Sequence, residues 1–168
     1  MKLAVALLLL TTFPALARAE AAGCRSLADI KSDVPPPELY AAMRACVAAD
    51  DLARAADLYA LAGTETAFDT ARVTDPAARE LHVALSKREL ARLDEARRSA
   101  LMAQLRATLT DPAKLPAKCA ELRKVGPPTY DPSYLLGKPV ETPASFDPVA
   151  TWKSALAAYL HCPDESLR

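Results

Sequence analysis

The sequence has little of what most recognised enzymes and nucleic-acid-binding proteins require. Its 168 residues include two histidines, four glycines and one tryptophan, and its 21 basic side chains are matched by 21 acidic ones. This balance excludes the strongly basic surface that binds nucleic acid or an anionic membrane. The glycine-rich phosphate-binding patterns, G-x-S-x-G and H-E-x-x-H are absent. We therefore expect no cofactor, and no sequence motif identifies a set of catalytic residues.

Long apolar runs are also missing after the N-terminus. Residues 1–19 combine Lys2, an apolar run over 3–10 and an A-x-A pattern that ends at Ala19. This order is typical of a secretory signal peptide cleaved after Ala19. No later run approaches the roughly 20 apolar residues that span a membrane as a helix. The sequence thus predicts one domain over 20–168 that is periplasmic or secreted and has no membrane span.

A lipoprotein signal is the alternative for this N-terminus. Cys24 follows three small residues, which suits a lipidated cysteine. Arg18 and Glu20, however, separate Cys24 from the apolar run, and no leucine precedes the small residues. We therefore favour cleavage after Ala19 over lipidation.

Four cysteines remain after the predicted cleavage site. They are Cys24, Cys46, Cys119 and Cys162. An even number in an exported chain predicts disulfides, and four cysteines allow three pairings. We favour Cys24–Cys46 with Cys119–Cys162, because each bridge then ties a terminal segment to a helix. No metal site is predicted, since the chain has no C-x-x-C and its histidines, His82 and His161, are far apart in sequence.

Few β-branched residues and almost no period-2 alternation predict an all-α fold. We expect a compact bundle of about six or seven helices with two disulfides. Asp75-Pro76, Asp111-Pro112 and Asp147-Pro148 each combine a capping aspartate with a first-turn proline, which predicts three helix starts. Ser86 and Glu89 have capping-box spacing, so we predict that one further helix covers 89–109.

Two other boundaries rest on a glycine and on a second capping box. The helix that starts at Leu52 is predicted to end at Gly63, since glycine is common just past a helix C-terminus. A separate short helix is then predicted over 66–73, with Thr66 and Asp69 at capping-box spacing. The helix that follows the prolines at 35–37 is predicted to bury one apolar face. That face consists of Leu39, Ala42, Met43 and Cys46.

Residues 37–63 resemble a single helical hairpin of the tetratricopeptide type. The second helix has the small, aromatic and small pattern of that family at Ala55, Tyr59 and Ala62. Met43 departs from the family, which usually has glycine there, and no second copy of the hairpin follows. A solenoid needs roughly three stacked repeats to bury its core. The resemblance therefore implies one hairpin within a larger helical domain, with an ordinary antiparallel helix pair as the alternative.

A wider set of short pieces is similar to a family of small exported bacterial proteins of unassigned function. The pieces are Leu58-Tyr59, Leu61-Ala62-Gly63, Phe68-Asp69, Arg72-Val73, Asp75, Gly126-Pro127-Pro128, Tyr130, Trp152 and Tyr159-Leu160-His161-Cys162. The similarity spans most of the chain after residue 19. It implies an exported helical protein and brings no mechanism with it.

The charged residues allow two interpretations. Asp69 and Arg72 are i, i+3 neighbours on a helix and lie close to Asp75, so the group is either a recognition patch or a local ion pair beside a helix cap. A glycoside hydrolase would need two facing carboxylates. Glu38, Asp69 or Glu80 could supply them, but no spacing in the sequence selects a pair.

The segment 126–146 is irregular, with five prolines and two of the four glycines. Five of the eight aromatic residues after residue 19 lie between 130 and 159. Such rings favour interfaces, and prolines reduce the entropy lost when a loop is held in its binding shape. The segment is therefore either a structural strap, with Tyr130 and Tyr134 packed on the helices, or a binding surface.

A small, disulfide-linked, exported domain without a recognisable catalytic site predicts a non-enzymatic protein-binding module of the cell envelope. A sharper form of this prediction is an inhibitor or immunity protein that blocks an envelope-acting toxin or hydrolase. The alternative is a small envelope hydrolase with a carboxylate pair in a polar cleft. The candidate partner-binding residues are Tyr130, Tyr134, Lys138, Trp152, Asp69 and Arg72. The sequence does not indicate the identity of the partner or the oligomeric state.

Overall fold

The structure is a computed structural model that describes residues 23–163. The predicted signal peptide and its cleavage site lie outside these residues. Within them the chain forms six α-helices, two 3₁₀ turns and no strand, which confirms the all-α prediction. Both predicted disulfides, Cys24–Cys46 and Cys119–Cys162, are formed. None of the helices in this range is long and apolar enough to cross a membrane.

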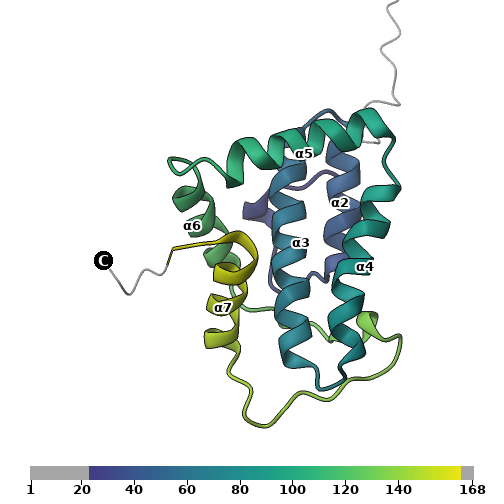
Figure 1. The fold of residues 1–168 in the computed structure, drawn as a ribbon, viewed down its shortest axis with the longest axis vertical. Helices are drawn as coiled ribbons and strands as arrows, with labels where there is room; N and C mark the ends of the chain where they lie inside the picture. Colours follow the sequence, from purple (N-terminus) through teal and green to yellow (C-terminus); the bar gives the residue numbers. More distant parts are fainter. Residues whose placement is uncertain (1–22, 164–168) are drawn as a thin grey trace, which may run out of the picture.

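The bundle is built around one central helix. The elements in chain order are η1 (Leu27–Asp29), α2 (Pro36–Ala48), α3 (Leu52–Arg72), α4 (Ala77–Ala91), α5 (Glu95–Leu109), α6 (Leu115–Val125), η2 (Pro132–Leu135) and α7 (Pro148–Leu160). Helices α2, α3 and α4 run side by side, α5 crosses one end of them, and α6 and α7 lie on the other side of α3 (Figure 1). Helix α3 therefore contacts α2, α4, α5 and α7.

The core is mostly one apolar cluster around α3. The face predicted for α2 is confirmed as buried, and its members are Leu39, Ala42, Met43 and Cys46. Helices α2 and α3 do pack together as a pair. The resemblance of this pair to a tetratricopeptide hairpin remains a prediction.

Helix α3 continues through Gly63, so the predicted helix end at this residue is wrong. A Cβ atom on Gly63 would lie 2.1 Å from the Tyr159 hydroxyl oxygen, so the glycine leaves room for the α7 side chain to cross α3. Thr66 does not cap a new helix. Its hydroxyl donates to the Ala62 carbonyl at 2.6 Å, inside the same helix. Close helix packing, rather than helix termination, accounts for the glycine.

The predicted single helix over 89–109 is also wrong. Ser86 and Glu89 lie inside α4, and the chain breaks between α4 and α5 at 92–94. The Asp94 carboxylate accepts the Arg97 backbone N–H at 2.9 Å and so caps the start of α5. The helix start is therefore set by the Asp94 cap of α5 and not by the capping-box pattern of Ser86 and Glu89.

The three Asp-Pro pairs behave differently. Asp147 accepts two backbone N–H groups in the first turn of α7, which confirms that prediction. Asp75 accepts the Ala77 N–H at 3.0 Å where α4 begins. Asp111 accepts the Ala113 N–H at 2.9 Å, but α6 itself begins only at Leu115, because a separate turn comes first.

Residues 126–146, which we call the strap, wrap the C-terminal half of α3. The strap begins at Gly126, which follows the last residue of α6 and has a φ of +83°. It passes behind α3 to η2 beside α4 and returns below the end of α3 to α7 (Figure 1). The Thr129 N–H donates to the Ser32 carbonyl at 2.8 Å, and Leu135 packs with Val73 in a small second core. The strap is thus an integral part of the fold.

Candidate functional sites: a buried cluster and an open groove

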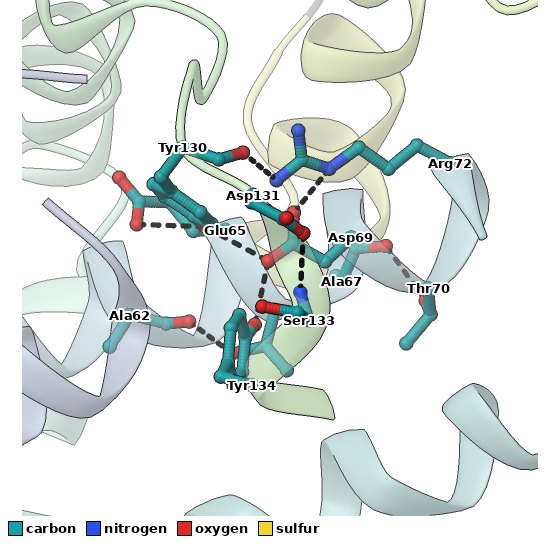
Figure 2. A network of polar contacts seen from close by, with 11 residues as sticks. Ala62, Glu65, Ala67, Asp69, Thr70, Arg72, Tyr130, Asp131, Ser133 and Tyr134 are labelled. Atoms are coloured by element: carbon teal, nitrogen blue, oxygen red, sulfur yellow. Dashed lines mark hydrogen bonds and ion pairs between the residues drawn. The ribbon is translucent and has the colours of Figure 1, made fainter. Parts of the chain in front are cut away.

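Three charged side chains lie buried on one face of α3. Glu65, Asp69 and Arg72 are spaced by four and three residues, so they follow one another along the helix surface. Glu65 and Asp69 are fully buried and Arg72 is 8% exposed. The strap covers them with Tyr130 and Tyr134 (Figure 2). We call these five residues the buried cluster.

Asp69 is the centre of the buried cluster. Arg72 Nε donates to Asp69 Oδ1 at 2.8 Å, while the hydroxyls of Tyr134 and Tyr130 donate to Asp69 Oδ2 at 2.6 and 2.9 Å (Figure 2). The Arg72 guanidinium also donates to the Tyr130 carbonyl at 2.8 Å and lies 5.1 Å from the centre of that ring. Hydrogen bonds to ionised groups are the strong ones, so this network fastens the strap to α3.

Glu65 has fewer and longer hydrogen bonds than Asp69. The Tyr130 hydroxyl lies 3.3 Å from Glu65 Oε2, and Oε1 has no partner among the described residues. Burial raises the pKa of Glu65 well above its usual value, and the neighbouring charge of Asp69 adds to this rise. Burial also raises the pKa of Asp69 to about 6, although Arg72 opposes the rise. The pair therefore retains a proton where exposed carboxyl groups have lost theirs.

The structure divides the predicted partner-binding residues. Tyr130, Tyr134, Asp69 and Arg72 come together in the buried cluster, with their polar atoms directed toward each other (Figure 2). The charged group at Asp69 and Arg72 is thus a local ion pair. Trp152 lies apart on α7, and Lys138 is an exposed strap residue near Asp75.

Glu65 is the member of the cluster that sequence reasoning missed. Its spacing of four residues from Asp69 would have placed both on one helix face. The mistaken helix end at Gly63 concealed this relation, because it placed Glu65 outside any helix. The other proposed acids, Glu38 and Glu80, are exposed and do not join the cluster.

A carboxylate pair with raised pKa values can serve as a general acid and base, which is what the hydrolase alternative required. A general acid must contact the atom that it protonates. Glu65 and Asp69 are inaccessible to solvent and line none of four grooves on the described part of the chain. In this arrangement the pair holds a proton, but neither carboxyl group is exposed to a molecule that arrives from solvent.

An open groove of about 460 Å³ lies between the end of α6 and α7. Its walls include Gly126, Pro127, Val149, Trp152 and Lys153. Val149 is 56% exposed and is one of two large apolar side chains that the described residues leave exposed. Trp152 is 4% exposed and its ring packs edge-to-face on Phe68 at 6.1 Å. The open groove is therefore a largely apolar hollow, and packing on Phe68 fixes the Trp152 ring in its wall.

Within residues 23–163, the charged side chains that line the open groove are of one sign. They are Arg123 and Lys153, and no carboxylate of this range lines the groove. A second groove, of about 560 Å³ beside η1, contrasts with it. There Lys118 Nζ lies 2.8 Å from Asp57 and 2.6 Å from Glu121, so this cation is already paired within the chain. Lys153, which makes no ion pair with residues 23–163, thus offers positive charge to an incoming group in the open groove.

The described residues contain no group of three or more His, Cys, Asp or Glu side chains that could hold a metal ion. All four cysteines are in disulfides, and His82 lies against the Tyr159 ring, where burial lowers its pKa. In comparisons with known proteins, no family model, curated protein or solved structure matches the chain. Its function has to be argued from the buried cluster and the open groove.

Proposed function

We propose that this chain is a non-enzymatic, periplasmic or secreted binding module that holds a segment of a partner protein in the open groove. The observation that carries the proposal is the exposed Val149 beside the Trp152 ring, in a hollow that Lys153 lines and that no carboxylate among residues 23–163 lines. Tryptophan is enriched at the centres of protein interfaces. Two disulfides support an oxidising compartment outside the cytoplasm.

The lining of the groove indicates the chemistry of the partner. Val149, Trp152 and Pro127 offer apolar contact, which favours an apolar segment. Lys153 makes no ion pair with any residue in 23–163. An acidic side chain next to the apolar segment of the partner would therefore form an ion pair with Lys153. Complementary charge gives specificity and speeds association more than it adds affinity. We therefore expect a partner segment that is apolar and flanked by a carboxylate.

The groove is held in shape by the covalent structure of the chain. The Cys119–Cys162 bridge ties α6 to Cys162, two residues past the end of α7, and Pro127 restricts the start of the strap. A groove fixed in advance loses less entropy when it binds. Such a rigid site suits the narrower form of the proposal, an inhibitor or immunity protein for an envelope-acting toxin or hydrolase.

The test uses two exposed valines as a matched pair. Val149→Asp introduces a carboxylate into the groove, whereas Val83→Asp makes the same change on the surface of α4. Partners captured from an envelope extract by the wild-type chain are identified and purified, and their affinity is measured by calorimetry for all three chains. We expect binding to be lost in Val149→Asp and kept in Val83→Asp, with equal unfolding midpoints. Equal binding by both variants would exclude the groove as the site.

A second measurement addresses the partner chemistry directly. Short apolar peptides flanked by glutamate or by lysine are titrated into the wild-type chain and into Lys153→Glu. We expect wild type to prefer the glutamate-flanked peptides and Lys153→Glu to lose that preference. A preference that does not depend on residue 153 would contradict the charge argument while leaving the groove itself in place.

A further inference from the structure

We propose that the strap is a proton-controlled latch, which is closed over α3 while the Glu65–Asp69 pair carries one proton and loosens when that proton leaves for solvent. This inference concerns the buried cluster and does not depend on any partner of the open groove.

The first step is a count of charges. The cluster contains two carboxyl groups, Glu65 and Asp69, and a single guanidinium, from Arg72. Asp69 accepts from Arg72 and from both tyrosine hydroxyls, as an ionised carboxylate would. Arg72 balances that one negative charge. A second negative charge on Glu65 would be buried without a counter-ion, which is strongly unfavourable.

The second step is a count of hydrogen atoms. The Tyr130 hydroxyl has one proton and lies 2.9 Å from Asp69 Oδ2 and 3.3 Å from Glu65 Oε2. When it donates to the nearer oxygen, its own lone pairs face Glu65. Two acceptors then face each other, unless Glu65 carries a proton and donates it to the Tyr130 oxygen. The closed arrangement is thus completed by a neutral Glu65.

Within residues 23–163, no other element supplies a compensating charge. Helix α3 contributes Arg72, and the strap contributes Tyr130 and Tyr134, whose pKa values burial raises so that both remain neutral donors. Tyr40 of α2 is another phenol whose pKa burial raises, but its neighbours are Tyr59 and Tyr159 rather than the pair. The other rings on this part of α3 are uncharged, from Phe146 and Trp152. Among the described side chains, Arg72 is therefore the one cation that acts on the pair.

The direction of the pH effect follows from this arrangement. Burial and the neighbouring charge of Asp69 raise the pKa of Glu65 in the closed form above its value in an open form. Between these two values, the closed form binds more protons than the open one, so closure weakens as pH rises. The strap is thus held most firmly where Glu65 is protonated and loosens as pH rises through the raised pKa of Glu65.

The experiment measures amide hydrogen exchange in the whole exported chain as a function of pH, corrected for intrinsic exchange. The Thr129 and Gly137 amides report on the strap, and the amides of α2 serve as an internal reference. In wild type, strap protection should fall by up to about tenfold per pH unit through the titration, while α2 protection stays constant. Glu65→Gln keeps a neutral donor at this position, so its strap protection should not vary with pH.

The control variant is Glu80→Gln, which neutralises an exposed glutamate on α4 and should behave as wild type. An unchanged pH dependence in Glu65→Gln, or pH-independent strap protection in wild type, would overturn the proposal. If Glu65→Gln fails to fold, infrared spectroscopy of wild type decides the matter. At about pH 6.5, where free glutamic acid is ionised, a protonated carboxyl band is expected, and its absence would also overturn the proposal.

Discussion

The buried cluster and the open groove use similar side chains in opposite ways. Each includes an aromatic ring and a cation: Arg72 lies over the Tyr130 ring in the cluster, and Trp152 and Lys153 both line the groove. In the cluster the chain supplies the counter-charge itself, since Arg72 is bound to Asp69. Around the groove, no carboxylate among residues 23–163 lines the wall. The chain supplies its own counter-charge in the first region, and we propose that a partner supplies one to Lys153 in the second.

Removal of the internal counter-charge should have the largest effect. Asp69→Asn keeps the shape of the side chain but leaves the Arg72 guanidinium buried without its carboxylate. Breaking a buried ion pair from one side costs about 3–5 kcal/mol. We expect the free energy of unfolding to fall by that amount, measured by urea denaturation. Binding in the open groove should fall only as far as the folded fraction does.

The matched control for Asp69→Asn is Asp94→Asn. Asp94 and Arg97 have the same i, i+3 spacing as the buried pair, but both side chains are 58% exposed. Asparagine also caps a helix as well as aspartate does. Because exposed pairs contribute about 0–1 kcal/mol, this change should be nearly neutral. Equal losses in the two variants would show that burial does not distinguish the cluster.

The two disulfides allow the two regions to be separated. Each should stabilise the fold by about 2–4 kcal/mol, with slightly more for Cys119–Cys162, because it closes 43 residues against 22 for Cys24–Cys46. We expect double serine substitution at either bridge to lower the unfolding free energy by about this amount. Only the loss of Cys119–Cys162 should also weaken partner binding, since that bridge holds the wall of the open groove. Equal binding losses would mean that the groove is not the site.

Much of the architecture could be predicted because it depends on local chemistry. Asp147 caps α7 through its own side chain, and Gly126 ends α6 with a positive φ, so both signals act within a few residues. The disulfide pairing follows from the expectation that each bridge ties a terminal segment to a helix, and the structure confirms it. Helix caps and helix ends of this kind depend on neighbouring residues and can therefore be predicted from a sequence.

The rest could not be predicted because it depends on distant residues. Gly63 reads as a helix end until Tyr159, almost a hundred residues later, is seen to cross it. The predicted helix end at Gly63 placed Glu65 outside any helix, so the sequence did not show that Glu65 and Asp69 lie on one helix face. The aromatic density near 130–159 likewise could not show that the hydroxyls of Tyr130 and Tyr134 bind Asp69 or that Trp152 packs on Phe68. These contacts join residues that are far apart in the sequence and meet only in the folded chain.

The contact between Gly63 and Tyr159 joins the two regions, because α3 carries the cluster and α7 carries the groove. Gly63→Ala should destabilise the chain by about 1–3 kcal/mol, the usual cost of overpacking a core. Helix propensity alone would give the opposite sign, since alanine favours a helix by about 1 kcal/mol over glycine. In a Tyr159→Ala background, where the clash is removed, the same substitution should therefore stabilise. Denaturation of the four chains of this double-mutant cycle measures the change in unfolding free energy that Gly63→Ala causes in each background.

The smallest effect is expected at Lys138, which belongs to neither region. Its Nζ lies 3.7 Å from Asp75, and both side chains are substantially exposed, so this pair should contribute less than about 0.5 kcal/mol. Lys138→Ala should change neither the unfolding free energy, nor the strap protection, nor the affinity for a partner. A loss of affinity alone would show that the partner reaches around the bundle to the strap near η2. It would also restore Lys138 to the binding surface that the sequence predicted.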